Sequence, residues 1–439
     1  MPRSDLAKAM TVLFVALNLH AADQPPVGAM QTIGEIRSRT GLPLPDNPSG
    51  PQPRFPPGIQ LANPLSADEA AEVALWNNPQ LWADLATLGI ARGDLIDAGL
   101  LRNPRLDILF PVGAKPFELL LNFPVEVFWQ RKRRVEASQA AYDQLAKSLV
   151  QNGLNTVRDA RVAHADLVLA VRREKAAEEA AKLRERIAEL TGVRLRAGDI
   201  SELDGMAART EAASSREQWI RLQHDSLLAV ERFRLALGLA LDRPAVGAAG
   251  APPDLTPPPV ASDLLSTALV ARPDLRAAEL AIAAATKRAR WERSRLALVA
   301  GQLSSKGIGT NGILTGPGLS AEIPIFHRNQ GLIARADAEV EVASRQYLSV
   351  KQRVAFEVHE SRELLVQAQE ALRRLRDEVV PPLRRITELA DDQYQKGDVA
   401  YLFVLEQSRS LVDAELRLAD AEAAVSRARA QLERSVGTK

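Results

Sequence analysis

The sequence predicts a mainly α-helical chain with a small antiparallel β part, arranged as two similar halves of one elongated body. Three observations carry this prediction. One stretch has the residue spacing of a very long helix, short alternating stretches typical of strands precede such helices, and matching landmarks recur along the chain. Aromatic residues make up only 4% of the chain, which suits long helices better than a large sandwich or α/β core.

The long helical stretch follows Gly331 and reaches Lys396 without another glycine. Its apolar residues recur every three or four positions and therefore form one stripe along a helix. A helix of about 68 residues extends roughly 100 Å, well beyond the length usual in a globular domain. The stripe consists of Leu365, Ala368, Leu372, Leu375, Val379, Leu383, Ile386 and Ala390.

The landmarks of this stretch also appear roughly 200 residues earlier in the chain. In both places a short strand pattern with a proline leads into a long helix, which ends at a Gly-Asp pair. We therefore interpret the chain as an internal duplication. The matched segments are 78–81 with 272–275, 121–125 with 321–325, and 196–200 with 395–399.

The first elements are a leader and an extended segment. Residues 1–22 have a positively charged start, an apolar segment from Ala9 to Leu19 and small residues at the end, which favours a signal peptide over a disordered start. Residues 23–65 are rich in proline, and we expect them to be extended and irregular.

The first repeat covers residues 66–242. It is predicted to begin with a helix that Ser66 caps, with Glu69 at the capping-box position, and that bends at Pro79. The later elements are a β-hairpin at 104–128, a long helix from about Trp129 to Arg196, and a return helix from Ser201 to Leu241.

The second repeat follows the same plan after a proline-rich linker at 243–261. Its predicted elements, within residues 262–439, are a helix from Ser262 to about Arg293, a β-hairpin at 295–326, the long helix, and a return helix from about Tyr401 to Val436.

The second long helix differs from the first in containing Pro381 and Pro382. Proline inside a helix removes a backbone hydrogen bond and bends the axis. We therefore expect a helix kink at these two residues and a straighter helix in the first repeat.

The hairpins are candidate membrane strands. In residues 117–127, apolar residues alternate with mostly polar ones over about 11 positions, near the length of a tilted membrane strand. An ordinary hairpin packed on a core has the same pattern, but these hairpins lie at the end of helices too long for a compact core. No stretch has the length of an apolar spanning helix, so a membrane crossing must use strands. Four strands cannot close a barrel, and several chains would share one.

Charge and cysteine content narrow the function classes. The 56 basic and 55 acidic residues give a net charge of +1, without the basic excess typical of nucleic-acid binding. Cysteine is absent, which excludes disulfides, a thiol nucleophile and N-terminal lipidation. The basic run at 131–134 is either a solvated face or, beside a membrane strand, a contact for anionic lipid.

No pattern predicts catalysis, a cofactor or a bound metal. The five histidines are scattered, and the stretch at His359 lacks the second histidine of a zinc-protease helix. Neither a phosphate-binding loop nor a nucleophile elbow occurs. We therefore expect a protein that is not an enzyme and that uses no cofactor.

The chain resembles the TolC family of outer-membrane efflux channels, also called outer-membrane factors. The resemblance covers roughly residues 66–436 and rests on the duplication and on two segments of the second copy. These segments are the strand-to-helix join at 321–331 and the turn at 394–399, which Leu402, Leu405 and the helix at 406–409 follow. The first copy matches the family pattern less closely.

The resemblance implies a homotrimer in which four strands from each chain form one twelve-stranded outer-membrane β-barrel, continued by an α-helical barrel across the periplasm. Such a protein is the passive exit duct of a tripartite efflux pump and carries drugs or metal ions to the exterior. Its partners would be a periplasmic adaptor protein, an inner-membrane pump and outer-membrane lipid. The half with Pro381 and Pro382 resembles the family's inner, bent helical pair.

The resemblance also assigns roles at the periplasmic tip, where family members receive the adaptor and where the pore opens. Glycine is the favoured residue where a helix ends in a left-handed conformation, which explains the same turns structurally. The residues assigned to adaptor docking are Gly198, Asp199, Gly397 and Asp398.

Two acidic residues close to these turns, Asp204 and Glu406, are candidates for acidic rings at the pore gate. The alternative is that both are solvated helix residues or members of ion pairs between helices.

A soluble periplasmic coiled-coil adaptor or scaffold is the alternative function. An adaptor has one long helical hairpin flanked by several small β-domains, whereas this chain has two predicted hairpins and few strands. The cargo stays open, because the sequence resembles the heavy-metal branch of the family about as closely as the drug branch.

Overall fold

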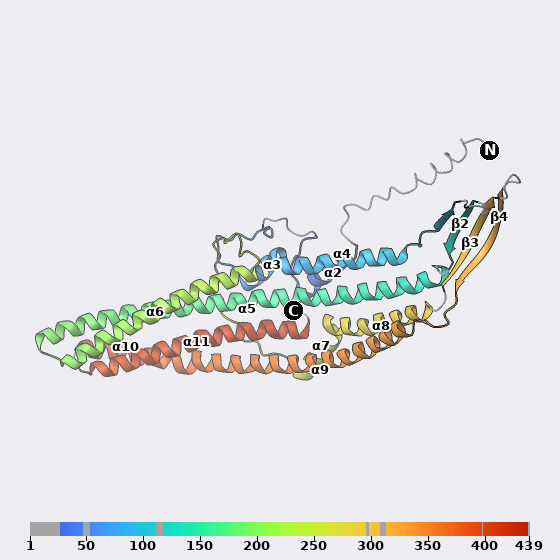
Figure 1. The fold of residues 1–439 in the computed structure, drawn as a ribbon. Helices are drawn as coiled ribbons and strands as arrows, with labels where there is room; N and C mark the ends of the chain where they lie inside the picture. Colours follow the sequence, from blue (N-terminus) through green and yellow to red (C-terminus); the bar gives the residue numbers. More distant parts are fainter. Residues whose placement is uncertain are drawn as a thin grey trace.

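The chain forms a long rod with a β-sheet at one end and, at the other, the turns that connect α5 (Val127–Ala197) to α6 (Glu202–Ala236) and α10 (Val380–Lys396) to α11 (Tyr401–Val436) (Figure 1). The C-terminus lies near the middle of the rod. This computed structural model confirms the predicted fold class, mainly α with a small antiparallel sheet. It describes residues 27–46, 53–110, 112, 117–125, 127–295, 298–307, 313–396 and 398–437. The predicted signal peptide lies outside the described residues.

The two predicted repeats contain corresponding elements in the same order, except that the second long helix is divided by a short π-helical segment. The first consists of α3 (Ala67–Asn77), α4 (Pro79–Gly99), β1 (Arg105–Leu109), β2 (Glu118–Pro124), α5 (Val127–Ala197) and α6 (Glu202–Ala236). The second consists of α7 (Ala261–Ala271), α8 (Pro273–Ser294), β3 (Leu298–Gly307), β4 (Ile313–Glu322), α9 (Gln330–Arg374), the π-helical segment η2 (Leu375–Val379), α10 (Val380–Lys396) and α11 (Tyr401–Val436).

The N-terminal segment is partly helical, so the prediction of extended chain over 23–65 was wrong at α2 (Val27–Thr40). Ile33 and Ile36 of α2 are buried, and Ile36 packs so closely on Gly153 of α5 that a Cβ there would lie 2.9 Å from it. The described prolines of this segment all follow the helix. The burial of one apolar face against α5 therefore stabilises a helix in a segment whose high proline content predicts extended chain.

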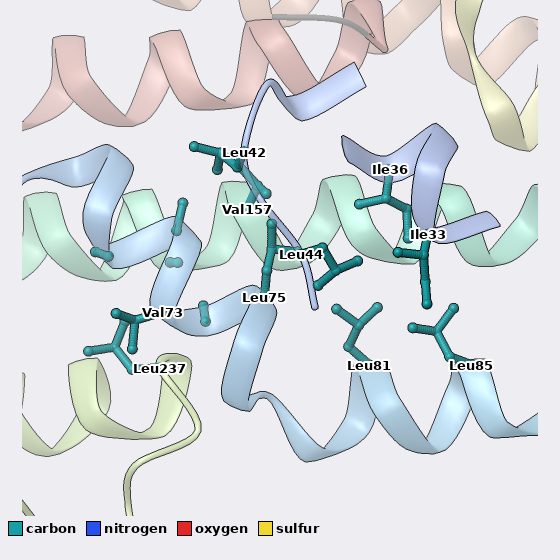
Figure 2. Close-up of a cluster of buried hydrophobic side chains, with 14 of the residues drawn as sticks. Ile33, Ile36, Leu42, Leu44, Val73, Leu75, Leu81, Leu85, Val157 and Leu237 are labelled. Atoms are coloured by element: carbon teal, nitrogen blue, oxygen red, sulfur yellow. The ribbon is translucent and has the colours of Figure 1, made fainter. Parts of the chain in front are cut away.

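The chain bends between α3 and α4, as predicted at Pro79. The predicted capping box is present: Glu69 N donates to Ser66 Oγ at 3.2 Å, and Ser66 N donates to Glu69 Oε2 at 2.8 Å. Figure 2 shows the core around this bend, where side chains of α2, α3, α4 and α5 meet the end of α6. Leu75 and Leu81, on either side of the bend, are both fully buried there.

The apolar stripe predicted along the second long helix is confirmed for most of its length. Leu365 and Leu372 are buried in one cluster with Val425 of α11, and Ala390 is buried near the end of α10. Ile386 is instead 41% exposed. The stripe thus holds α9 and α10 on α11, as in a coiled coil.

A row of ion pairs along α5 and α11 joins the two repeats. Arg427 of α11 lies 2.6 Å from Asp166 of α5. The further pairs of this row are Arg161 with Glu433, Arg172 with Glu422, and Arg173 with Asp420. The seam therefore combines ion pairs with a small apolar cluster of Leu169, Ala419 and Ala423.

The bend between α7 and α8 is centred on a buried cation. Arg272 has a completely buried side chain and lies 2.5 Å from both Asp274 and Glu357. Its guanidinium also donates to the Ser435 carbonyl oxygen at 3.2 Å. Arg272 thereby ties the second repeat's first helices to α9 and to the end of α11.

Candidate functional site

The sheet has one mainly apolar and one mainly polar face. Its strands run in the order β1-β2-β3-β4, and each neighbouring pair is antiparallel. Opposite residues share a face and successive residues alternate, so the register assigns each residue to a face. The apolar face includes Leu106, Ile108, Leu119, Leu121, Phe123, Leu303, Pro317 and Leu319, and the polar face includes Arg105, Asp107, Glu118, Asn122, Gln302, Lys306 and Glu322.

The apolar face is open to the surroundings. Leu106 is 55% exposed, Leu319 is 73% exposed and Phe123 is 46% exposed. An apolar surface that spans four strands marks a contact with lipid or with another protein. The alternation predicted for the strands is therefore present, without a core over the exposed face.

The polar face is cross-linked by side chains of neighbouring strands. Lys306 of β3 lies 3.0 Å from Glu118 of β2, and Asn122 donates to Asp107 of β1 at 3.1 Å. These charged pairs suit a surface in contact with water.

Both edges of the sheet are unpaired within the described residues, where β1 pairs only with β2 and β4 only with β3. A free edge exposes a row of backbone donors and acceptors that another chain can pair with. The sheet is therefore built for extension on both sides.

Asn329 fixes the join between the sheet and α9. It has a left-handed backbone with φ of 58°, which asparagine adopts more readily than most residues. Its Nδ2 atom donates to the Glu292 carbonyl oxygen at 2.8 Å and to Glu292 Oε2 at 3.0 Å. This buried residue therefore ties the start of α9 to the end of α8, a role that its sequence pattern did not reveal.

Two residues of the basic run at 131–134 have a structural role. Arg131 donates to the Gly99 carbonyl oxygen at 2.6 Å, and Arg134 donates to the carbonyl oxygens of Ala98 at 2.8 Å and Leu100 at 2.6 Å. Cations are favourable at a helix C-terminus, where carbonyl groups lack partners. These arginines therefore cap α4, and the run is not simply a solvated face.

At the opposite end of the rod, the predicted turn at Gly198 and Asp199 is a glycine-capped helix end. Gly198 has φ of +83°, its N–H donates to Leu195 O at 3.0 Å, and Asp199 N donates to Arg194 O at 3.0 Å. This pair of bonds closes α5 as a Schellman motif. In the second repeat, Asp398 N donates to Gln393 O at 2.9 Å, the same outer bond, while Gly397 lies outside the described residues.

The two candidate gate residues have different surroundings. The Asp204 carboxylate accepts a hydrogen bond from Ser201 Oγ at 2.7 Å, while its backbone N–H donates to that hydroxyl at 3.1 Å. Asp204 thus lies in the first turn of α6 and is bonded to the N-cap residue Ser201. Glu406 is exposed on α11, and its carboxylate forms no ion pair with any residue that the structure describes.

The tip also exposes apolar side chains that sequence reasoning missed. Leu203 is 76% exposed, Met206 is 60% exposed and Leu402 is 69% exposed. At Gly205, which lies between Leu203 and Met206 in the sequence, α6 approaches α5 closely. A Cβ on Gly205 would lie 2.7 Å from the Leu195 side chain. In the sequence, these exposed residues could be recognised as apolar residues that lie close to a turn and outside the apolar stripe of their helix.

Two contacts link the helical hairpins of the two repeats near the tip, and neither was predicted. The Arg194 guanidinium carbon lies 5.2 Å from the Tyr394 ring centre, in a cation–π contact between α5 and α10. Arg409 of α11 pairs with Glu211 of α6. The hydrogen bond from Arg409 holds the pKa of Glu211 below its ordinary value, although burial acts in the opposite direction.

The proline pair begins two positions after Val379, the last residue of the π-helical segment η2. Pro381 and Pro382 lack the backbone N–H groups that would bond to the carbonyls four residues earlier, which lie in η2. The wider π turn is therefore located where the prolines interrupt the ladder. α5 contains no such segment along its length.

The histidines that the structure describes do not gather in a site. His164 is buried against Phe233 and its Nε2 atom lies 2.9 Å from Leu65 O, and burial lowers its pKa. Among the described residues, no three His, Cys, Asp or Glu side chains are grouped to hold a metal ion. No described helix combines the length and apolar character needed to cross a membrane.

Comparison with known proteins gives a consistent result. The family model described as outer membrane efflux protein matches residues 105–239 and 264–438. The cobalt-zinc-cadmium resistance protein CzcC of Cupriavidus metallidurans is 25% identical over 372 residues, which cover 83% of this chain and 88% of the relative.

Solved structures share the fold. CusC has a TM-score of 0.71 at 21% identity, over 85% of this chain and 92% of the other. The outer membrane protein VceC of Vibrio cholerae has a TM-score of 0.68 at 20% identity, over 85% of this chain and 96% of the other. The open MtrE outer membrane channel of Neisseria gonorrhoeae has a TM-score of 0.69 at 17% identity, over 85% of this chain and 89% of the other.

Proposed function

Because this chain belongs to the outer membrane efflux protein family, we propose that it is the exit duct of a tripartite efflux pump. The family assigns the chain to the outer membrane. The proposed duct is a passive homotrimeric channel whose helices extend into the periplasm. It takes cargo from an inner-membrane pump and a periplasmic adaptor protein and releases it outside the cell. We further propose that it has no catalytic activity.

The amphipathic sheet with two free edges is the observation that carries this proposal. Three copies of a four-stranded sheet supply enough strands for a closed barrel, and closure pairs every edge. The face with Leu303 and Leu319 then contacts lipid, and the face with Glu118 and Lys306 lines a water-filled lumen.

The helical tip is the proposed adaptor-docking site. The turns at Gly198-Asp199 and Gly397-Asp398 are its proposed centre, and exposed Leu203 and Leu402 support it because apolar side chains at a helix end suit packing against helices of a partner.

The two links between the hairpins are proposed to hold the tip closed. Arg194 with Tyr394, and Arg409 with Glu211, each join a helix of the first repeat to one of the second. Adaptor docking would separate these helices and open the pore. Glu406 is the better of the two candidates for a gate acid, because the Asp204 carboxylate is already bonded to the hydroxyl of Ser201, the N-cap residue of α6.

Drugs or metal ions are the proposed cargo. The similarity to a protein named for cobalt, zinc and cadmium resistance supports metal ions. Deletion of the gene should then sensitise the cell to these ions, whereas sensitivity to drugs alone would favour the drug branch.

Extraction and conductance test the duct itself. The protein should leave membranes only with detergent, run as a heat-labile trimer and form conducting pores in planar bilayers. Release by osmotic shock as a monomer without pore activity would instead favour a soluble periplasmic coiled-coil adaptor or scaffold.

A further inference from the structure

The helix ends beside the sheet form a cationic surface, and we propose that it binds the phosphate headgroups of anionic phospholipids in the periplasmic leaflet. This inference rests on the membrane position of the sheet proposed above. We define the collar as residues 99–105, 129–134, 290–295 and 322–331, which adjoin the helix-side ends of the four strands.

The collar is basic although the whole chain is nearly neutral. Its four segments contain two, four, three and one Arg or Lys residues, but only two carboxylates in all, Glu292 and Glu322. Asp97 of α4 and Glu136 of α5 each lie two residues outside this band, about 3 Å along the helix, so acidic residues border the band without belonging to it. The excess positive charge is therefore concentrated beside the sheet.

Some of this charge is used within the chain, and some is free. Arg131 and Arg134 cap α4, and Arg295 lies 3.0 Å from Glu292. Arg105 pairs with Asp107, and Arg293 pairs with Asp337. Four other collar cations are exposed and pair with no residue that the structure describes. They are Arg102, Lys132, Arg133 and Arg290. Exposed cations without partners carry their full charge to a ligand.

These cations lie at the depth of lipid headgroups. The headgroup region on each side of a bilayer is about 5–8 Å thick. Lys132 lies about 8 Å from the start of α5, and Arg290 about 6 Å from the end of α8. Trp129, which is 44% exposed, belongs to the same band, and tryptophan is enriched at this depth.

The position of the collar selects the leaflet. The collar lies at the ends of α4, α5 and α8, the helices that would extend into the periplasm, so its cations meet the inner surface of the outer membrane. Each basic residue near an anionic bilayer surface strengthens binding about fivefold at low ionic strength.

Quenching by brominated lipid tests the proposal on the intact trimer. The trimer is reconstituted into vesicles of phosphatidylcholine and phosphatidylglycerol in which only one of the two lipids is brominated. Bromine quenches tryptophan on contact, and Trp129 and Trp291 both lie in the collar. We expect phosphatidylglycerol to be preferred at least about fivefold, with the preference falling as salt is added.

Neutralising the free cations should abolish this preference. The test variant combines Arg102→Gln, Lys132→Gln, Arg133→Gln and Arg290→Gln. The control combines Lys175→Gln, Arg232→Gln, Lys351→Gln and Arg353→Gln, which remove the same charge from exposed positions on the helices farther from the sheet. Both should remain heat-labile trimers, and only the control should keep the preference.

Two results would overturn the inference: equal quenching by both lipids in the wild type, or an unchanged preference in the test variant. Equal quenching in the wild type would mean that the collar does not select anionic lipid and that its cations serve another partner. If neither lipid quenched at all, the sheet would not lie in a bilayer, and the proposed function itself would fail.

Discussion

At the residue scale, a few polar side chains hold together segments that are far apart in the sequence. Arg272 joins α8, α9 and α11 through carboxylates and a carbonyl, and Asn329 joins α8 to α9. Such contacts leave no periodic signal, because periodicity records which face of an element is buried and not which polar partner it meets. The sequence therefore indicated the capping box of Ser66 and Glu69, whose partners are local, but not these residues.

Arg272→Met should strongly destabilise the chain, because it leaves the part-buried Asp274 without its cation and leaves Glu357 with Arg434 alone. Breaking a buried pair from one side costs about 3–5 kcal/mol. The trimer should dissociate at a clearly lower temperature on heated gels. Arg276→Met, which removes an exposed pair with Glu279 one turn further on, should cost less than about 1 kcal/mol. Equal effects of both substitutions would contradict a special role for Arg272.

The link between Glu211 and Arg409 should make the closed tip sensitive to acid. A carboxylate whose pKa is lower in the folded state stabilises that state above the pKa of the unfolded chain, and this stabilisation is lost as the pH falls through the folded value. Because the pKa of Glu211 is lowered from 4.5, the link is intact at pH 7 and lost in the acid range below that value.

Single-channel conductance should therefore rise in acid for the wild type. Glu211→Gln should show raised conductance already at pH 7 and little further change in acid. Glu231→Gln is the matched control, since this half-buried residue at the other end of α6 also pairs with arginines. If Glu211→Gln kept the wild-type profile, this link would not hold the tip closed.

At the element scale, long periodic segments were predicted well and short ones less well. α11 has the predicted bounds of Tyr401 and Val436, and α5 differs from its prediction by only a few residues at each end. α2 was missed because its few turns follow from burial against α5, which composition does not record. The change of helix axis at Pro381 and Pro382 stays a prediction, although η2 marks the altered hydrogen bonding there.

Gly238, at the end of α6, should be a critical glycine of the fold. Its φ of +75° disfavours any side chain, and an added Cβ would overlap the Asn77 carbonyl oxygen at the end of α3. Gly238→Ala should therefore cost more than about 2 kcal/mol. Gly89→Ala, at an open helical position of α4, should instead stabilise by about 0.5–1 kcal/mol. Urea unfolding followed by circular dichroism compares the two, and a tolerated Gly238→Ala would show that α3 and α6 can separate.

At the scale of the whole molecule, the duplicated plan was readable because both copies keep their landmarks in the same order. The pairing of β2 with β3 was not, because it joins hairpins from different repeats and depends on how the helices bring them together. The features of the tip can likewise be divided into those that the sequence predicts and those that depend on packing. Its turns have a glycine signal, whereas the contact of Arg194 with Tyr394 exists only once two hairpins pack side by side.

The two faces of the sheet should respond oppositely to a charge. Leu303→Arg places a cation at the centre of the apolar face, where arginine costs about 2–4 kcal/mol in lipid. It should abolish the heat-labile trimer in membranes. Gln302→Arg, the adjacent residue on the polar face, should leave assembly intact. Membrane fractionation with unheated gels measures both, and normal assembly of Leu303→Arg would contradict the assignment of this face to lipid.

The free edges of the sheet also determine when a newly made polypeptide leaves water. Backbone groups without partners cost several kcal/mol each in hydrocarbon, so a solitary copy is held back from insertion by β1 and β4. Membrane entry and association of copies then become one event, whose rate rises more steeply than in proportion to the amount of protein. A coexpressed copy that offers only one competent edge should consequently act as a dominant inhibitor, because it joins a growing ring and prevents its completion.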